Sequence, residues 1–377
     1  MNKAGKTVKI LIYAPRIHLN FRPLINQLTI LGHDITIAYS YSSKFDYQYS
    51  KIVQIDNSNM ESFINKFIRI IIRKKIRITL PSIEKFNQLI KDINPDVIII
   101  KTRLLFFLLL ALYKPKKSKD YILLHQDPIY SCSESVIQKL RFLTIKILRI
   151  RNLSPNLSSG EYSSWELEKY RKKSCKYSYW IPFLFEVKNT NPKVLKSKES
   201  LKLLVVSRYS PFKRIELVIE ALNNLRSKLN VELIIAGNLT DSNYFKNIKE
   251  LVRKLKLSNI VSFHTDLSDK ELETLYNDSH IFVHPSHFDP APIAVAEALS
   301  WGMPILLSNE AGLSYSIKNG INGHIIDFKD IESVSHIIDN YMSNPSLIEF
   351  QSSKSIEISY DLYSIEWLNK FINDFLN

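Results

Sequence analysis

The chain is poor in cysteine, with only Cys132 and Cys175 among 377 residues. Two thiols cannot build a disulfide framework or a four-cysteine zinc site, and such low cysteine usage is typical of proteins from a reducing compartment. The amino-terminal residues 1–9 are polar and basic, without the apolar stretch of a secretory signal. We therefore expect a cytoplasmic protein.

Long apolar runs are also missing. The most apolar stretch, residues 104–113, has about ten residues, whereas a membrane-spanning helix needs roughly twenty. The composition, 45% hydrophobic and 23% charged, is ordinary for a globular protein, and at roughly 100–200 residues per domain the length suggests two domains. Together these features exclude a membrane-spanning protein and a largely disordered one.

Acidic residues are scarce in the first half only. Residues 1–199 hold 35 Lys and Arg against 15 Asp and Glu, and residues 200–377 hold 16 against 22, so the two halves carry net charges of +20 and −6. The surplus gathers at 66–77 and 139–151, where basic and aliphatic residues alternate as in basic amphipathic helices. An anionic membrane surface is the partner we expect, with a solvated helix face as the alternative. The lack of stacking aromatics argues against nucleic acid.

β-branched runs alternate with helix-like segments along the chain. Near-continuous apolar runs are typical of strands buried on both faces of a parallel sheet, so the alternation predicts two doubly wound, Rossmann-like α/β domains. We expect these domains at 1–185 and 200–359, with a polar linker at 186–200 and a last helix at about 360–377 that packs back on the first domain. The expected strands span 8–13, 34–38, 96–101, 121–125, 203–206, 232–236, 260–263, 281–284, 305–307 and 324–326, and helices are expected at 21–31, 215–225 and 270–276.

Ligands of open α/β sheets bind outside the carboxyl ends of the strands, so the loops after strands are the places to search. The loop after 203–206 carries Arg208 and Lys213 and leads into a helix. An Arg fork, a Lys charge and a helix amino terminus together suit a diphosphate. Two solvated surface cations are the alternative reading of this loop.

The loop after 281–284 opens a helix that carries two carboxylates. Asp289 before Pro290 predicts a helix N-cap with proline at the first helical position. Glu297 is the only charge in an apolar run, and a buried carboxylate needs a partner that ligand hydroxyls would supply. Because prolines carry no N–H, the amides left to meet a phosphate at this helix start are those of Ala291, Ile293 and Ala294.

Three histidines, His264, His284 and His287, stand near these segments. They lack the i, i+4 pairing of a helical zinc motif, and we expect no metal site. A fourth, His125, follows the strand at 121–124, where a structural role is the alternative to a role in a site.

With these residues the chain resembles the retaining glycosyltransferases of family 4, which have the GT-B fold of two Rossmann-like domains facing a cleft. The hallmark of that family is a pair of glutamates separated by seven residues, and Asp289 and Glu297 have this spacing with Asp in the first place. The resemblance also covers Gly237 and the segments 302–304 and 319–323.

The resemblance implies a role for each of these side chains. Asp289 would contact hydroxyls of the donor sugar, and Glu297 would hold the nucleotide ribose. Arg208 and Lys213 match the phosphate-binding cations of the family, and His125 matches a histidine near the donor sugar. The catalytic set implied is therefore Asp289, Glu297 and His125.

The chain departs from the family pattern at three places. Arg214 stands where a glycine is usual, and the first loop, 14–21, is not glycine-rich. Arg16, His18 or Asn20 could substitute for the contacts of that loop. The segment 311–315 lacks the acid that often follows the later Gly-Gly pair of the family.

The resemblance implies transfer of a sugar from a UDP- or GDP-sugar with retention of configuration, without metal or cofactor. The departing phosphate would accept the proton of the acceptor. A basic first domain fits a lipid-linked saccharide acceptor of bacterial surface polysaccharide synthesis, with the protein peripheral on the inner face of the cell membrane. Two alternatives stay open: a sugar-nucleotide epimerase of the same fold, and a non-catalytic protein that binds membrane or nucleic acid.

Overall fold

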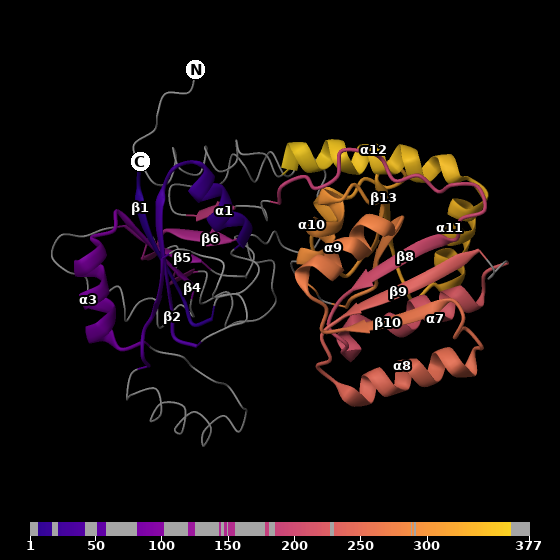
Figure 1. The fold of residues 1–377 in the computed structure, drawn as a ribbon, viewed down its shortest axis with the longest axis horizontal. Coiled ribbons are helices and arrows are strands. Elements are labelled where there is room, and N and C mark those ends of the chain that lie inside the picture. Colours follow the sequence, from indigo (N-terminus) through magenta and orange to yellow (C-terminus); the bar gives the residue numbers. More distant parts are fainter. Residues whose placement is uncertain are drawn as a thin grey trace. The chain divides into compact units, whose positions relative to one another are not determined.

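The structure is a computed structural model that divides into two compact units (Figure 1). Unit 1 comprises residues 1–155, 172–184 and 365–377, and unit 2 comprises 156–171 and 185–364. The residues described are 7–16, 22–41, 51–57, 81–101, 120–124, 143–144, 147–148, 150–154, 178–180, 185–226, 230–287, 289 and 292–362.

In its described part, unit 1 forms a seven-stranded parallel sheet in the order β3-β2-β1-β4-β5-β6-β7. The core residues of β1 and β4 are buried on both faces, as expected for a parallel sheet covered by helices. The strands are β1 (Lys9–Ala14), β2 (Asp34–Tyr39), β3 (Ile52–Gln54), β4 (Val97–Lys101), β5 (Asp120–Leu124), β6 (Asn152–Ser154) and β7 (Ser178–Trp180).

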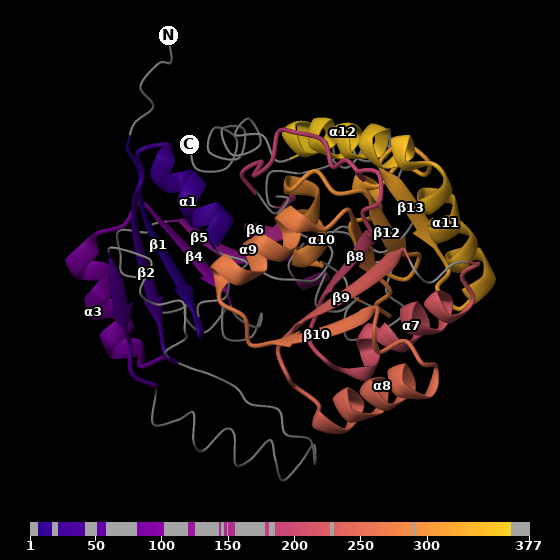
Figure 2. The ribbon, with the colours of Figure 1, turned by 45° about the vertical axis from the view of Figure 1, so that its right-hand side comes forward.

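Helices α1 (Arg22–Ile30) and α3 (Ile83–Ile93) lie on opposite faces of this sheet (Figures 1 and 2). Phe86 of α3 packs edge-on against the buried ring of Tyr13 in β1, with 5.5 Å between the ring centroids. The sheet order turns at β1, which pairs with β2 on one side and β4 on the other. Right-handed crossovers that run in opposite directions from one strand place their helices on opposite faces.

In its described part, unit 2 forms a six-stranded parallel sheet in the order β10-β9-β8-β11-β12-β13. Its strands are β8 (Leu201–Val206), β9 (Val231–Gly237), β10 (Val261–Thr265), β11 (Ile281–His284), β12 (Ile305–Ser308) and β13 (Gly323–Ile326). Its helices are α7 (Ile215–Asn223), α8 (Ser242–Lys254), α9 (Asp269–Asp278), α10 (Ile293–Ser300), α11 (Ile331–Ser343) and α12 (Pro345–Leu362), with 3-10 turns η3 (Pro211–Lys213) and η4 (Ser314–Ser316). Both units confirm the predicted class of doubly wound α/β domains.

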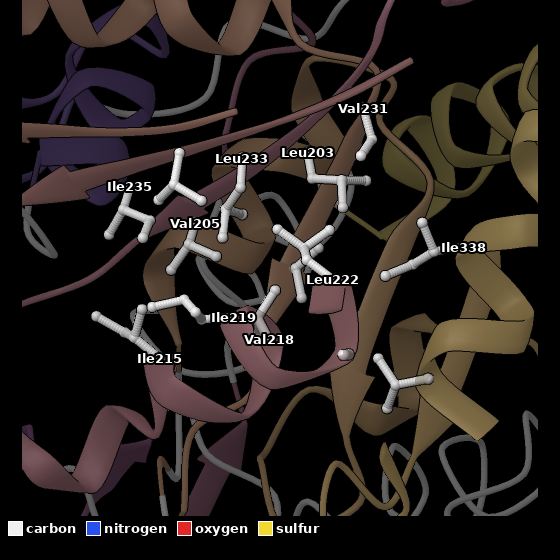
Figure 3. Packing of buried hydrophobic residues seen from close by; sticks show 14 of the residues in the cluster. Leu203, Val205, Ile215, Val218, Ile219, Leu222, Val231, Leu233, Ile235 and Ile338 are labelled. Atoms are coloured by element: carbon white, nitrogen blue, oxygen red, sulfur yellow. The ribbon is translucent and has the colours of Figure 1, made fainter. Parts of the chain in front are cut away.

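The core of unit 2 shows why α7 forms where the sequence predicts it. Ile215, Val218, Ile219 and Leu222 follow the i, i+3, i+4, i+7 spacing of one helix face and are fully buried. Figure 3 shows these side chains pointing toward the strand residues of the same cluster, such as Val205. Helices α7 and α8 cover the face of the sheet that carries this cluster, and α9 and α10 cover the opposite face of the sheet (Figures 1 and 2).

The segment expected as a linker, 186–200, has no regular structure but is attached to unit 2. The amide of Lys188 donates to the carbonyl of Ser300 at 2.8 Å, and the amide of Lys193 donates to the hydroxyl of Ser352 at 2.7 Å. Lys193 is buried, and its ammonium donates to the carbonyls of Tyr276 and Asn277 at the end of α9. The segment is therefore part of the packing of unit 2.

Several predicted features lie outside the described residues. They are the basic stretch at 66–77, most of the stretch at 139–151, and the last helix beyond residue 362. Among the helices that the structure describes, none combines the length and the apolar composition needed to cross a bilayer.

Candidate functional site

The candidate site lies at the switch point of the sheet in unit 2. Strand β8 leads to β9 on one side, and β11 pairs with β8 on the other, so the loops after β8 and β11 leave the same edge in opposite directions. Such a point opens the crevice in which doubly wound sheets bind ligands. Arg208 and Lys213 follow β8, and Asp289 follows β11.

Lys213 and Asp289 form an ion pair between these two loops, with side chains that are 14% and 19% exposed. The Nε2 atom of His284, 2% exposed, lies 3.4 Å from Oδ2 of Asp289 without hydrogen-bond geometry. Burial raises the pKa of the Asp289 carboxyl, but His284 and Lys213 lower it by more, so the net pKa lies well below the ordinary value. Burial also lowers the pKa of His284, and Asp289 only partly offsets this effect. The site therefore holds an ionised Asp289 next to Lys213 and His284.

Arg208 differs from Lys213 in that its side chain is exposed. Within the residues that the structure describes, its guanidinium forms no ion pair. The neighbouring Tyr209 is fully buried and anchors the loop, because its hydroxyl donates to the carbonyl of Ile235 at 2.8 Å. Arg208 is thus a cation on a fixed loop that is available to an anionic ligand.

Arg214 joins η3 to α7 in the left-handed conformation, with φ 47° and ψ 39°. A glycine adopts this conformation at low cost, whereas a residue with a side chain is strained in it. In this chain the arginine uses the position to reach Glu310, to which its NH1 group donates at 2.8 Å.

Glu310, on the loop after β12, is the centre of a cluster that sequence reasoning missed. It accepts from Arg214, from Nδ1 of His287 and, at 3.0 Å, from the ammonium of Lys329. Its hydrogen bonds with His287 and Lys329 and the charge of Arg214 outweigh burial and lower the pKa of Glu310 to about 2. One carboxylate therefore ties together the loops that follow β8, β11, β12 and β13. The signal that could have found it is a lone acid in the loop after the predicted strand 305–307.

The predicted N-cap at Asp289 is wrong. Helix α10 begins at Ile293, with Pro292 in the capping position. A proline disfavours helical backbone at the residue before it, so Pro292 prevents the helix from beginning at Pro290. The backbone carbonyl of Asp289 instead accepts the amide of Gly312 at 2.7 Å, which links the loops after β11 and β12. The Asp289 side chain forms an ion pair with Lys213 and does not cap the helix.

The amides of Ile293 and Ala294 lie in the first turn of α10, whose N–H groups have no partner within the helix. They stand at the same edge of the sheet as Asp289. Two other predicted site residues, Ala291 and His125, lie outside the described residues. His264 sits on β10, the far edge strand of the sheet, away from His284 and His287.

Glu297, in the second turn of α10, is partly buried. The hydroxyl of Tyr276, at the end of α9, donates to its Oε2 atom at 2.9 Å. Tyr276 is buried, and burial followed by the charge of Glu297 raises its pKa well above the ordinary value, so the phenol keeps its proton. The sequence predicts a partner for this buried carboxylate, and a tyrosine hydroxyl is that partner for at least one of the two carboxylate oxygens.

The family model "Glycosyl transferases group 1" matches residues 187–356, a segment that contains all of these unit 2 side chains. An uncharacterized glycosyltransferase of Haemophilus influenzae is 23% identical over 90% of each chain. An uncharacterized glycosyltransferase of Methanocaldococcus jannaschii is 28% identical over 43% of this chain, and this match spans only 41% of that relative.

Among solved structures, HepE of Anabaena in complex with UDP and glucose has a TM-score of 0.71, with 15% identity over 97% of this chain and 98% of that chain. At this identity the likeness shows the fold. It confirms that the two parallel-sheet α/β domains have the architecture of GT-B glycosyltransferases.

Proposed function

We propose that this protein is a glycosyltransferase that takes a sugar from a nucleotide-diphosphate sugar. The observation that carries this proposal is the Lys213–Asp289 ion pair between the loops after β8 and β11, at the switch point of unit 2, with Arg208 on the first of these loops. A diphosphate needs cations and amide donors, and the sugar next to it needs a carboxylate for its hydroxyls. The match of the glycosyltransferase family model over the same residues supports transfer over the epimerase and non-catalytic readings.

The chemistry follows from where charge develops. As the glycosidic bond breaks, the leaving diphosphate gains negative charge, which Arg208, Lys213 and the amides of Ile293 and Ala294 stabilise. Asp289 orients the sugar, and Glu297, held by Tyr276, binds the ribose. Retention of configuration, with the leaving phosphate as acceptor of the proton, remains part of this proposal.

A uridine nucleotide is the donor we favour, because HepE, which shares the fold, binds UDP and glucose. For the acceptor we propose a lipid-linked saccharide at an anionic membrane surface. The net charge of +20 over residues 1–199 supports this choice.

Thermal unfolding with UDP, GDP, ADP or CDP tests the proposal. A ligand at about 100 times its Kd stabilises the unit that binds it by roughly 2.7 kcal/mol. We expect one diphosphate to raise the unfolding temperature of the wild type and of the control Arg226→Ala, an exposed arginine of unit 2. The shift should vanish in Arg208→Ala. No shift with any of the four nucleotides, or an undiminished shift in Arg208→Ala, would refute the assignment.

A further inference from the structure

The segment 186–200 contacts the carboxyl-terminal ends of both α9 and α10. The amide of Lys188 donates to the carbonyl of Ser300, the last residue of α10, at 2.8 Å. The ammonium of Lys193 donates to the carbonyl of Tyr276, in the last turn of α9, at 2.9 Å. These two helices bear Tyr276 and Glu297, whose hydrogen bond holds the carboxylate proposed to bind the donor ribose. The segment therefore contacts the elements that support the proposed nucleoside site.

Lys193 places a buried charge at the end of α9. The residue is 6% exposed, and its ammonium also donates to the carbonyl of Asn277 at 2.6 Å. The last carbonyls of a helix have no partner within the helix and form its negative end, so a cation is favourable there. Burial lowers the pKa of the ammonium to about 8, and the charge of Asp278 offsets part of this effect, so the group stays largely protonated at pH 7. Lys193 therefore fixes the end of α9 with a charged group.

Tyr276 transmits the position of its backbone to Glu297 because its side chain is confined. The residue is 2% exposed, and its ring stacks on that of Phe282 with 6.0 Å between the ring centroids. A close-packed ring has no room to reorient independently, so a shift of the Tyr276 backbone displaces the hydroxyl as well. That hydroxyl donates to Glu297 at 2.9 Å. A single residue thus connects the ammonium of Lys193 to the carboxylate of Glu297.

We propose that Lys193 is a positioning residue for the nucleoside part of the donor: it fixes Tyr276 and, through Tyr276, the carboxylate of Glu297. This inference rests on the proposed function, in which Glu297 binds the ribose. It separates two parts of one ligand, because the diphosphate is bound by Arg208 and Lys213 on the loop after β8. Loss of the Lys193 ammonium should therefore weaken a ligand that contains ribose and leave the binding of a bare diphosphate unchanged.

The test is calorimetric titration of the full chain at pH 7, once with UDP and once with inorganic pyrophosphate. The variant is Lys193→Met, which keeps the length and apolar stem of the side chain but removes its donors. The control is Lys196→Met, which removes an exposed lysine of the same segment. We expect Lys193→Met to bind UDP at least about fivefold more weakly and pyrophosphate within about twofold of the wild type. The control should bind both ligands like the wild type.

A double-mutant cycle shows whether Lys193 acts through Tyr276. Tyr276→Phe removes the hydroxyl that reaches Glu297, so it already cuts the connection. Adding Lys193→Met to Tyr276→Phe should therefore weaken UDP binding by less than about twofold more, since residues that act through one another are not additive. Fully additive losses would mean that Lys193 acts independently of Tyr276 and would overturn the proposal.

The two ligands also separate positioning from general support of the fold. Equal weakening or loss of UDP and pyrophosphate in Lys193→Met would make Lys193 a structural residue of unit 2 and overturn the inference. Lys193→Gln, which keeps one donor, should show the same selectivity for UDP with a smaller loss. Unchanged UDP binding in both variants would overturn the inference and leave the proposed function intact. If UDP fails to bind the wild type, the proposed function falls and the inference falls with it.

Discussion

Lys213 and Asp289, which are 76 positions apart in the sequence, form an ion pair at the carboxyl edge of the sheet in unit 2. The proposed roles of the two side chains differ, since the lysine serves the diphosphate and the aspartate serves the sugar. When a diphosphate binds, Lys213 must therefore either contact both the diphosphate and Asp289 or leave its ion pair with Asp289. The pair keeps both charges compensated while no donor is bound.

Replacement of Asp289 by asparagine should separate nucleotide binding from transfer. The variant keeps the shape of the side chain but frees Lys213, so UDP should bind up to about fivefold more tightly, since a partly exposed ion pair contributes at most about 1 kcal/mol. Transfer from the UDP-sugar should nevertheless fall at least about tenfold, because the contact with the sugar weakens. Calorimetry and initial rates measure the two effects. Glu349→Gln on α12 is the control for loss of a negative charge, and weaker UDP binding in Asp289→Asn would contradict the role of Lys213.

Tyr276→Phe should impair donor binding without loss of fold. The change removes only the hydroxyl that orients Glu297, and a hydrogen bond to a charged group contributes about 1.5–3 kcal/mol. We expect the KM for the nucleotide sugar to rise about tenfold while kcat changes little. Tyr341→Phe is the matched control, because this buried tyrosine of α11 bonds only to Gln351 among the contacts described. An unchanged KM in Tyr276→Phe would show that Glu297 needs no such positioning.

Arg214 offers a test of its left-handed conformation. Both Arg214→Gly and Arg214→Ala lose the ion pair with Glu310, but only glycine relieves the backbone strain. The glycine variant should therefore be more stable than the alanine variant by about 1 kcal/mol. Urea unfolding of unit 2 measures the difference. Equal stability of the two variants would mean that the conformation costs nothing at this position.

The lowered pKa of Glu310 predicts that the free energy of unfolding falls in acid. The pKa of this carboxyl is lowered from 4.5 to about 2 in the folded state, so its contribution is complete above about pH 4.5 and is lost as the pH falls toward 2. The urea midpoint of the wild type should therefore drop between pH 6 and pH 3.5 by more than that of Glu310→Gln. Glu349→Gln should retain the full drop of the wild type. The cluster would have no part in acid stability if all three proteins lost the same amount.

Local sequence was sufficient for ten of the thirteen strands that the structure describes and for the loops that follow them, whereas the three-residue strands β3, β6 and β7 were not predicted. Strand β11 occupies 281–284 as predicted, and β8 extends the predicted 203–206 by two residues at its start. Strands buried on both faces leave a continuous apolar run that can be read without knowledge of their neighbours. Because ligand loops follow the ends of such strands, Arg208, Lys213 and Asp289 could be picked out as site candidates from the same pattern.

The sequence by itself thus determined the fold class, the positions of the described strands longer than three residues and the charges at the edge of unit 2. The tertiary structure alone decided how these charges are paired: Asp289 with Lys213 rather than as a helix cap, Glu297 with Tyr276, and Glu310 with three basic side chains from three other loops. The physical reason is that such partners come from loops whose proximity depends on the order of the strands in the sheet. Strand order is set by packing and crossover direction over the whole unit, and no local pattern records it.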